Sequence, residues 1–268
     1  MRDFRIIQHI NLSLDSINDP ICLLGMPGIA DVGKFAIDQI IGLLKAKPYL
    51  EIIFNDYPAG AIVDDCLLSA PKAEIMFWKD PNNIRDFFLV TADSQALNPK
   101  GIYKISDFIA SLMYKFKIKL IISLGAFPTN NPSKSPSIFF STTNKDFIDQ
   151  FIKDGKCKRI KKGVIVGANG LIPTLVKARF NIDGIVFLAE TDNIAVINDE
   201  ITDLKASISL INLLKENFNL PIERKYTLEK IDEITKNLKI KKEKLERDLD
   251  NFHLMDKNSE EKRKSLYI

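Results

Sequence analysis

Residues 21–35 have the sequence ICLLGMPGIADVGKF. The four apolar residues at 21–24 predict a buried strand, and Gly25, Pro27 and Gly28 directly after them predict a sharp turn that the proline stiffens. From residue 29 to residue 44 apolar side chains recur at helical spacing. A strand, a glycine-rich turn and a helix in this order are typical of an α/β sheet covered by helices.

The same alternation continues along the chain to about residue 220. Short apolar runs predict strands at 21–24, 50–54, 73–78, 87–91, 118–124, 163–166 and 184–189. Amphipathic stretches predict helices at 29–44, 102–116, 144–152, 168–180 and 203–218. Residues 127–137 contain Pro128, Pro132 and Pro136 among Thr, Asn and Ser, which predicts an exposed loop that serves as a connector or carries contacts.

The composition changes after Pro221. About half of the remaining residues are charged, with both signs mixed, and no glycine follows, which predicts a helical arm and not a second core. With Leu228 at position a of a heptad, the a and d positions also take Ile231, Leu238, Leu245, Leu249 and Phe252, with polar Thr235 and Lys242 at two further a positions. This seam either joins copies of the chain or packs as a single amphipathic helix on its own domain. We expect an α/β domain at 1–220, a helical extension at 221–256 and a flexible tail at 257–268.

The overall composition excludes several classes of protein. The 38 basic and 35 acidic residues leave a net charge of only +3, which predicts no nucleic-acid partner. Cys22, Cys66 and Cys157 are too far apart for a CxxC metal site or a disulfide framework. No apolar run reaches the length of a membrane span, and the N-terminus has no signal-peptide pattern, so we expect a cytoplasmic protein that does not insert into membranes.

Residues 28–34 match the glycine and lysine spacing of a phosphate-binding loop. The match fails at Phe35, because this motif needs a Ser or Thr hydroxyl there to bind magnesium. The alternative is structural: the glycines allow a sharp turn and close packing where a strand meets a helix, and Lys34 lies partly exposed on that helix. A nucleotide- or nucleoside-binding enzyme that uses Gly28–Lys34 therefore stays the second hypothesis for this chain.

Catalytic side chains are sparse in this sequence. His9 and His253 lie at opposite ends, outside the expected sheet domain, so a histidine-based nucleophile pair or metal cluster is not expected. Asp64 and Asp65 are adjacent and predict a turn. Glu190 ends a predicted strand, where it could act as an acid or base or cap the following loop or helix. Trp78 is either a recognition residue or part of the core. We expect no enzyme activity, no cofactor and no metal.

Several short motifs follow one another along the chain: Gly25-Met-Pro-Gly28-Ile with Val32-Gly33-Lys34, Trp78-Lys79, Arg85-Asp86, Phe88-Leu-Val-Thr91, Asp93-Ser-Gln95, Gly125, Gly163 with Ile165-Val-Gly167-Ala168, Gly170-Leu171 and Leu188-Ala-Glu190-Thr191. In their order and spacing they resemble the proteasome assembly chaperone 2 family, especially its archaeal proteasome-binding homologues. Ala30, Asp31 and Ala92 stand where the archaeal pattern tends to have glycine. The resemblance implies a three-layer α/β/α sandwich with a charged helical extension. It also implies a homo-oligomer, with a tetramer expected, that acts on the proteasome as a chaperone or activator without catalysis.

The chain ends in Leu266-Tyr267-Ile268. This fits the hydrophobic-Tyr-X (HbYX) terminus by which proteasome activators and assembly chaperones dock into pockets between the α-ring subunits. By composition alone such a pair of residues would arise about 1% of the time. Capture of the Ile268 carboxylate would fix the chain end while Leu266 and Tyr267 bury apolar surface, and the resemblance implies that Tyr267 favours an open gate. Assembly of α-rings, gate opening and capping remain open, as does a coiled-coil adaptor whose partner is unrelated to proteasomes.

Overall fold

The computed structural model describes residues 3–153, 155, 157–192 and 202–222, all within one compact unit that spans Met1–Arg224. The expected helical extension at 221–256, apart from its first two residues, lies outside this range. The heptad seam, His253, the tail at 257–268 and the terminal Leu266, Tyr267 and Ile268 lie outside it as well.

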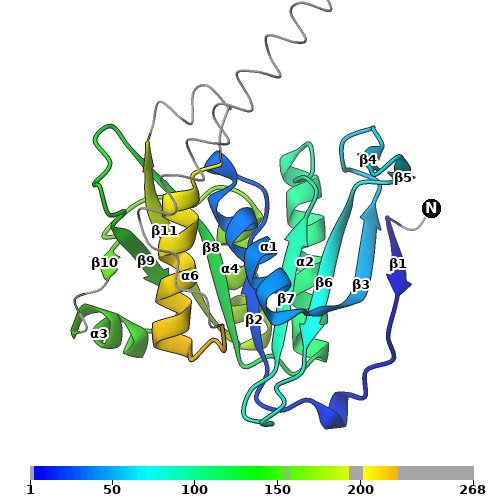
Figure 1. The fold of residues 1–268 in the computed structure, drawn as a ribbon, viewed down its shortest axis with the longest axis horizontal. Helices are drawn as coiled ribbons and strands as arrows, with labels where there is room; N and C mark the ends of the chain where they lie inside the picture. Colours follow the sequence, from blue (N-terminus) through cyan, green and yellow to red (C-terminus); the bar gives the residue numbers. More distant parts are fainter. Residues whose placement is uncertain (1–2, 154, 156, 193–201, 223–268) are drawn as a thin grey trace, which may run out of the picture. The chain divides into compact units, whose positions relative to one another are not determined.

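A large sheet runs through the centre of the unit (Figure 1). Its nine strands are β1 (Phe4–Gln8), β2 (Ile21–Leu24), β3 (Lys47–Phe54), β6 (Lys72–Trp78), β7 (Phe87–Ala92), β8 (Leu120–Thr129), β9 (Ile138–Thr142), β10 (Cys157–Arg159) and β11 (Asp183–Asp192). They are ordered β1-β3-β6-β7-β2-β8-β11-β9-β10. The four neighbours β7, β2, β8 and β11 run parallel to one another. A separate hairpin joins β4 (Ile62–Asp64) to β5 (Leu67–Ser69).

Helices cover both faces of the sheet, as the sequence predicts for an α/β fold. Figure 1 shows α1 (Val32–Leu44) and α6 (Leu204–Phe218) in front, with α2 (Pro99–Lys115) and α4 (Ala168–Phe180) behind. The helix α3 (Asp146–Lys153) lies near β10 and β9, and two short 3-10 turns, η1 (Leu14–Ser16) and η2 (Ile29–Asp31), complete the described elements. Two clusters of buried apolar side chains fill the spaces on either side of the sheet.

The burial of each strand follows from its position in the sheet. All residues of β2 and β7 are buried, because these central strands are covered by helices on both faces. In β6, further from the centre, fully buried residues alternate with partly buried ones. The strand at 21–24 and the helix at 168–180 have the bounds that the sequence predicts.

Two of the sequence predictions are wrong. Residues 163–166 form no strand but an irregular segment outside the sheet, where Val164 and Val166 are exposed. The loop predicted at 127–137 begins only after Thr129, because β8 continues through Pro128 alongside β11. Proline fits there because β2 pairs with β8 only as far as Ser123, which leaves the other edge of β8 without a strand to bond at that position. The strands β1, β4, β5, β9 and β10 were not predicted.

Candidate functional site

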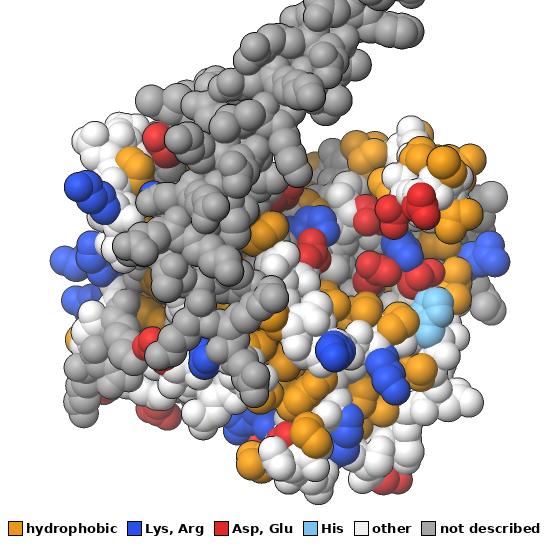
Figure 2. Space-filling model, in the orientation of Figure 1, with side chains coloured by type: hydrophobic (Ala, Val, Ile, Leu, Met, Phe, Trp, Pro, Cys, Tyr) orange, Lys and Arg blue, Asp and Glu red, His pale blue; other side chains and the backbone are white. Residues whose placement is uncertain are grey.

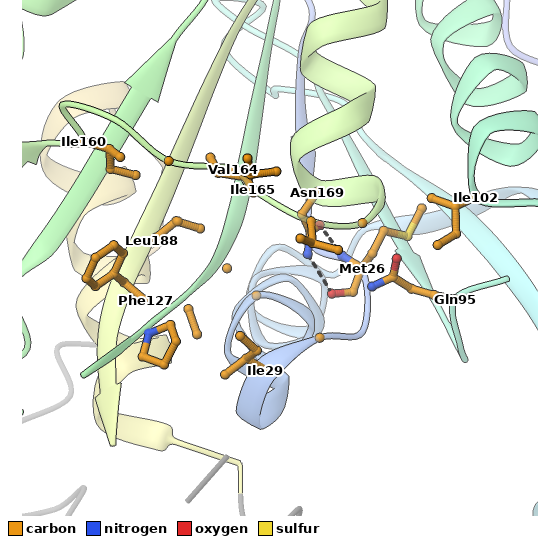
Figure 3. Close-up of a pocket in the computed structure, with 18 of the residues that line it drawn as sticks. Met26, Ile29, Gln95, Ile102, Phe127, Ile160, Val164, Ile165, Asn169 and Leu188 are labelled. Atoms are coloured by element: carbon orange, nitrogen blue, oxygen red, sulfur yellow. Dashed lines mark hydrogen bonds between the residues drawn. The ribbon is translucent and has the colours of Figure 1, made fainter. Parts of the chain in front are cut away.

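A cavity of about 720 Å³ opens at the carboxyl ends of the parallel strands β2, β8 and β11. This edge is where open α/β sheets commonly bind their ligands. Figure 3 shows side chains that converge on it from the turn after β2, from β8 and β11, and from the segment 160–167. The lining is mainly apolar and includes Met26, Ile29, Phe127, Val164, Val166 and Leu188.

Two amide side chains hold one wall of the cavity in place. Asn169, in the first turn of α4, accepts a hydrogen bond from the Met26 amide at 2.9 Å and donates one to the Met26 carbonyl at 3.1 Å (Figure 3, dashed lines). Gln95 donates to the carbonyl of Pro27 at 2.5 Å and accepts from the amide of Ala168 at 3.1 Å. The turns after β2 and β7 and the start of α4 are thereby joined, so this wall is formed without a ligand.

The loop that resembles a phosphate-binding motif is used for packing. A Cβ at Gly25 would lie 2.2 Å from the Gly33 carbonyl oxygen, and one at Gly33 would lie 2.1 Å from the Leu124 carbonyl oxygen. Both positions therefore require glycine, which lets α1 approach β8 closely. The ammonium of Lys34 binds Asp38 one turn further along α1 at 2.8 Å, and Lys34 does not line the cavity. These contacts agree with the structural interpretation of residues 28–34.

Ala30 and Asp31, which occupy glycine positions of the archaeal pattern, both have a left-handed backbone. Their φ angles are 47° and 46°. Glycine adopts this conformation without steric cost, whereas other residues do so at a cost of roughly 1–2 kcal/mol each. The turn therefore keeps the shape that glycine favours, although this chain has other residues there.

Glu190 stabilises the loop at 130–137. Its side chain is buried, and one carboxylate oxygen accepts hydrogen bonds from the amides of Ser133 at 3.2 Å and Ser137 at 3.1 Å. Burial alone would raise the pKa of this carboxyl, but these N–H donors outweigh it and hold the pKa below its ordinary value. The next helix, α6, is capped by Asp203, whose side chain accepts a hydrogen bond from the Ala206 amide and a second one from the Thr191 hydroxyl.

The other two candidate groups also have structural roles. Asp64 and Asp65 lie at the turn of the β4–β5 hairpin, which confirms the predicted turn. Trp78 is partly buried and its ring lies 5.8 Å from that of Phe87, so the core interpretation is confirmed.

The motif Arg85-Asp86 lies at the other end of the parallel strands, where it stabilises a turn. Asp86 is completely buried and accepts hydrogen bonds from the amides of Asn18 and Asp80 and from the Lys79 ammonium at 2.8–3.0 Å. Arg85 pairs with Asp19. These contacts join the residues before β2 to the connection between β6 and β7. The motif residues therefore stabilise the fold at this place.

The sequence analysis quoted Gln95 only as part of a family motif, with no role assigned to it, and did not identify Asn169 or the cavity. His9 lies away from the cavity, 3.2 Å from the carboxylate of Glu51. Within the part of the chain that the structure describes, no three His, Cys, Asp or Glu side chains come together as a possible metal site. Among the same residues, no helix has both the length and the apolar character needed to cross a bilayer.

Comparisons with known proteins agree with this architecture. PbaB of Pyrococcus furiosus, an archaeal proteasome activator, has a solved structure that is similar to this chain with a TM-score of 0.76 and 25% identity, over 92% of this chain and 100% of that one. PbaA of the same organism, an archaeal homologue of proteasome-assembly chaperone, shares the fold with a TM-score of 0.68 at 17% identity, over the whole of both chains. An uncharacterized protein of Methanocaldococcus jannaschii is 26% identical over 189 residues, 70% of this chain and 71% of that protein. The family model described as PAC2 family matches residues 22–242, and the chain therefore belongs to the PAC2 family.

Proposed function

We propose that this protein binds the proteasome core particle and acts as a non-enzymatic assembly chaperone or activator in the cytoplasm. The observation that carries the proposal is the similarity to PbaB, an archaeal proteasome activator, along nearly the whole of both chains. Membership in the PAC2 family and the fold shared with PbaA support it. The polar side chains Gln95 and Asn169 of the cavity wall are engaged in fixing loops, which also favours a binding protein over an enzyme.

The contact with the α-ring is proposed to be made by Leu266, Tyr267 and Ile268. The Ile268 carboxylate pairs with a cationic group in the ring pocket, while Leu266 and Tyr267 bury apolar surface next to it. Tyr267 is the residue proposed to favour the open gate. One such anchor binds weakly, because a flexible chain end loses entropy when it is fixed. Several anchors on one homo-oligomer, proposed to be a tetramer with helical extensions at 221–256, bind together far more tightly.

The test is to change only the chain end. Tyr267→Ala, and separately one added residue after Ile268, should abolish co-purification with archaeal core particle and any stimulation of its peptide hydrolysis. Tyr103→Ala is the matched control, because Tyr103 is an exposed tyrosine on α2. Circular dichroism and molecular mass should stay as in the wild type for all three proteins. Full core-particle binding by the lengthened chain would refute the proposed anchor.

A further inference from the structure

The β4–β5 hairpin exposes an unusual amount of apolar surface. Every residue from 59 to 70 is exposed, and both Leu67 and Leu68 keep 75% of their surface in contact with solvent. Figure 2 shows hydrophobic side chains gathered over this hairpin at the upper right of the molecule. Asp65 and Cys66 have φ angles of 43° and 65°, the left-handed pair of a two-residue turn that matches strand twist. The hairpin is therefore an ordered apolar protrusion, a feature that commonly marks a contact with another protein.

The apolar cavity described above is a surface of the same chain that could receive such a protrusion. The cavity at the ends of β2, β8 and β11 is bordered by the segment 161–166, where Val164 is 87% and Val166 84% exposed. Among the described residues the backbone of this segment makes no hydrogen bond after the amide of Ile160, which donates to Phe140. Within the described part of the chain, the N–H and C=O groups of this segment therefore have no backbone partner, and groups of this kind accept an added strand.

The charges at the two places are opposite. The hairpin carries Asp64 and Asp65 at its turn, and the segment beside the cavity carries Lys161 and Lys162, all four of them exposed. Lys162 belongs to the cavity lining itself. Among the described residues that line the cavity, none belongs to the hairpin of the same chain, so the hairpin does not fill its own cavity.

We propose that the β4–β5 hairpin of one copy of this protein inserts into the cavity of a second copy. Val63, Leu67 and Leu68 enter the apolar cavity, a hairpin strand pairs with the backbone of residues 161–166, and the two aspartates approach Lys161 and Lys162. Each copy has one hairpin and one cavity, so the contact is head-to-tail and closes into a ring if its rotation allows. It requires neither the terminal anchor nor the proteasome.

Complementation between variants tests the head-to-tail geometry. Leu67→Asp with Leu68→Asp removes the hairpin surface, and Val164→Asp with Val166→Asp removes the cavity surface. All four side chains are exposed, so the fold should persist, as circular dichroism checks. In multi-angle light scattering each variant alone should have a smaller mass than the wild type. An equimolar mixture should recover one contact, because one partner still has a hairpin and the other a cavity. Unchanged masses for the single variants, or no recovery in the mixture, would overturn the proposal.

Cross-linking tests the same contact at a single pair of residues. Cys66 lies exposed at the tip of the hairpin, whereas Cys22 and Cys157 are buried. With Val164→Cys, a short bismaleimide should join Cys66 of one copy to the new thiol of the next and give a ladder of three or more chains in a denaturing gel. Adding Cys66→Ser should remove the ladder. Ile84→Cys is the control, since Ile84 is exposed at 70% in the connection between β6 and β7. A ladder no stronger with Val164→Cys than with Ile84→Cys would overturn the contact.

Discussion

Gly33 lies so close to the sheet that a larger residue does not fit. The contact that its Cβ would make, 2.1 Å to the carbonyl oxygen of Leu124, involves backbone and cannot be relieved by a rotamer change. We expect Gly33→Ala to lower the free energy of unfolding by about 1–3 kcal/mol or more, because α1 must move away from β8. Gly42 in the same helix has nothing within 4 Å, so Gly42→Ala should raise it by about 0.5–1 kcal/mol. Urea denaturation measures both, and equal stabilities for the two variants would contradict this packing.

Glu190 makes the loop at 130–137 sensitive to acid. Its pKa is lower in the folded chain than its ordinary value of 4.5, so its stabilisation is fully present above that value and is lost as the pH falls through the folded pKa. Glu190→Gln should therefore cost about 1–2 kcal/mol at pH 7 and progressively less below pH 4.5. Urea denaturation across this range measures the difference. Asp149→Asn, at an exposed site on α3, is the control. If the loss of stability in Glu190→Gln is the same at every pH, the Glu190 carboxylate does not stabilise the loop through its charge.

At the scale of elements, the turn after β2 is joined to the start of α4 by the side chain of Asn169. Asn169→Leu would leave both the amide and the carbonyl of Met26 without their partners, at a cost of about 1–3 kcal/mol. We expect faster hydrogen exchange at Met26 in this variant as well as lower stability. Thr174→Ala, on an exposed part of the same helix, should change the stability by less than about 0.5 kcal/mol. Protection at Met26 equal to that of the wild type would show that the turn does not depend on Asn169.

The elements that the sequence predicts well are those whose pattern is local. The strand at 21–24 and the helix at 168–180 combine a continuous apolar pattern with clear turn residues at both ends. Residues 163–166 have the composition of a strand, but they lie in the connection between the end of β10 at Arg159 and the start of α4 at Ala168. No described strand pairs with this connection, so its apolar residues do not form a strand. The exposed strands β4 and β5 have no buried face, so hydrophobic alternation could not reveal them.

At the scale of the whole molecule, the family was predictable from the sequence and the cavity was not. Gly25 and Gly33 allow close packing where β2 and α1 meet β8, and glycines after an apolar run are visible in a sequence. The cavity depends on contacts between distant residues: Asn169 and Met26 are 143 positions apart, and Gln95 and Pro27 are 68 apart. Periodicity describes neighbours within one element and contains no information about such pairs.

The two proposals together predict how oligomer size controls binding to the core particle. Leu67→Asp with Leu68→Asp keeps Leu266, Tyr267 and Ile268 unchanged but should reduce the number of chain ends in one assembly. Since linked anchors gain about 10²–10⁴ in avidity over a single one, this variant should bind core particle more weakly by up to that factor.

Surface plasmon resonance with immobilised core particle measures this loss of affinity. The chain lengthened by one residue is the matched control, since it should keep the mass of the wild type and yet fail to bind. If the hairpin variant has a smaller mass and still binds as tightly as the wild type, then several anchors are not needed. One chain end would then be sufficient for tight binding, and the proposed contribution of avidity would be refuted.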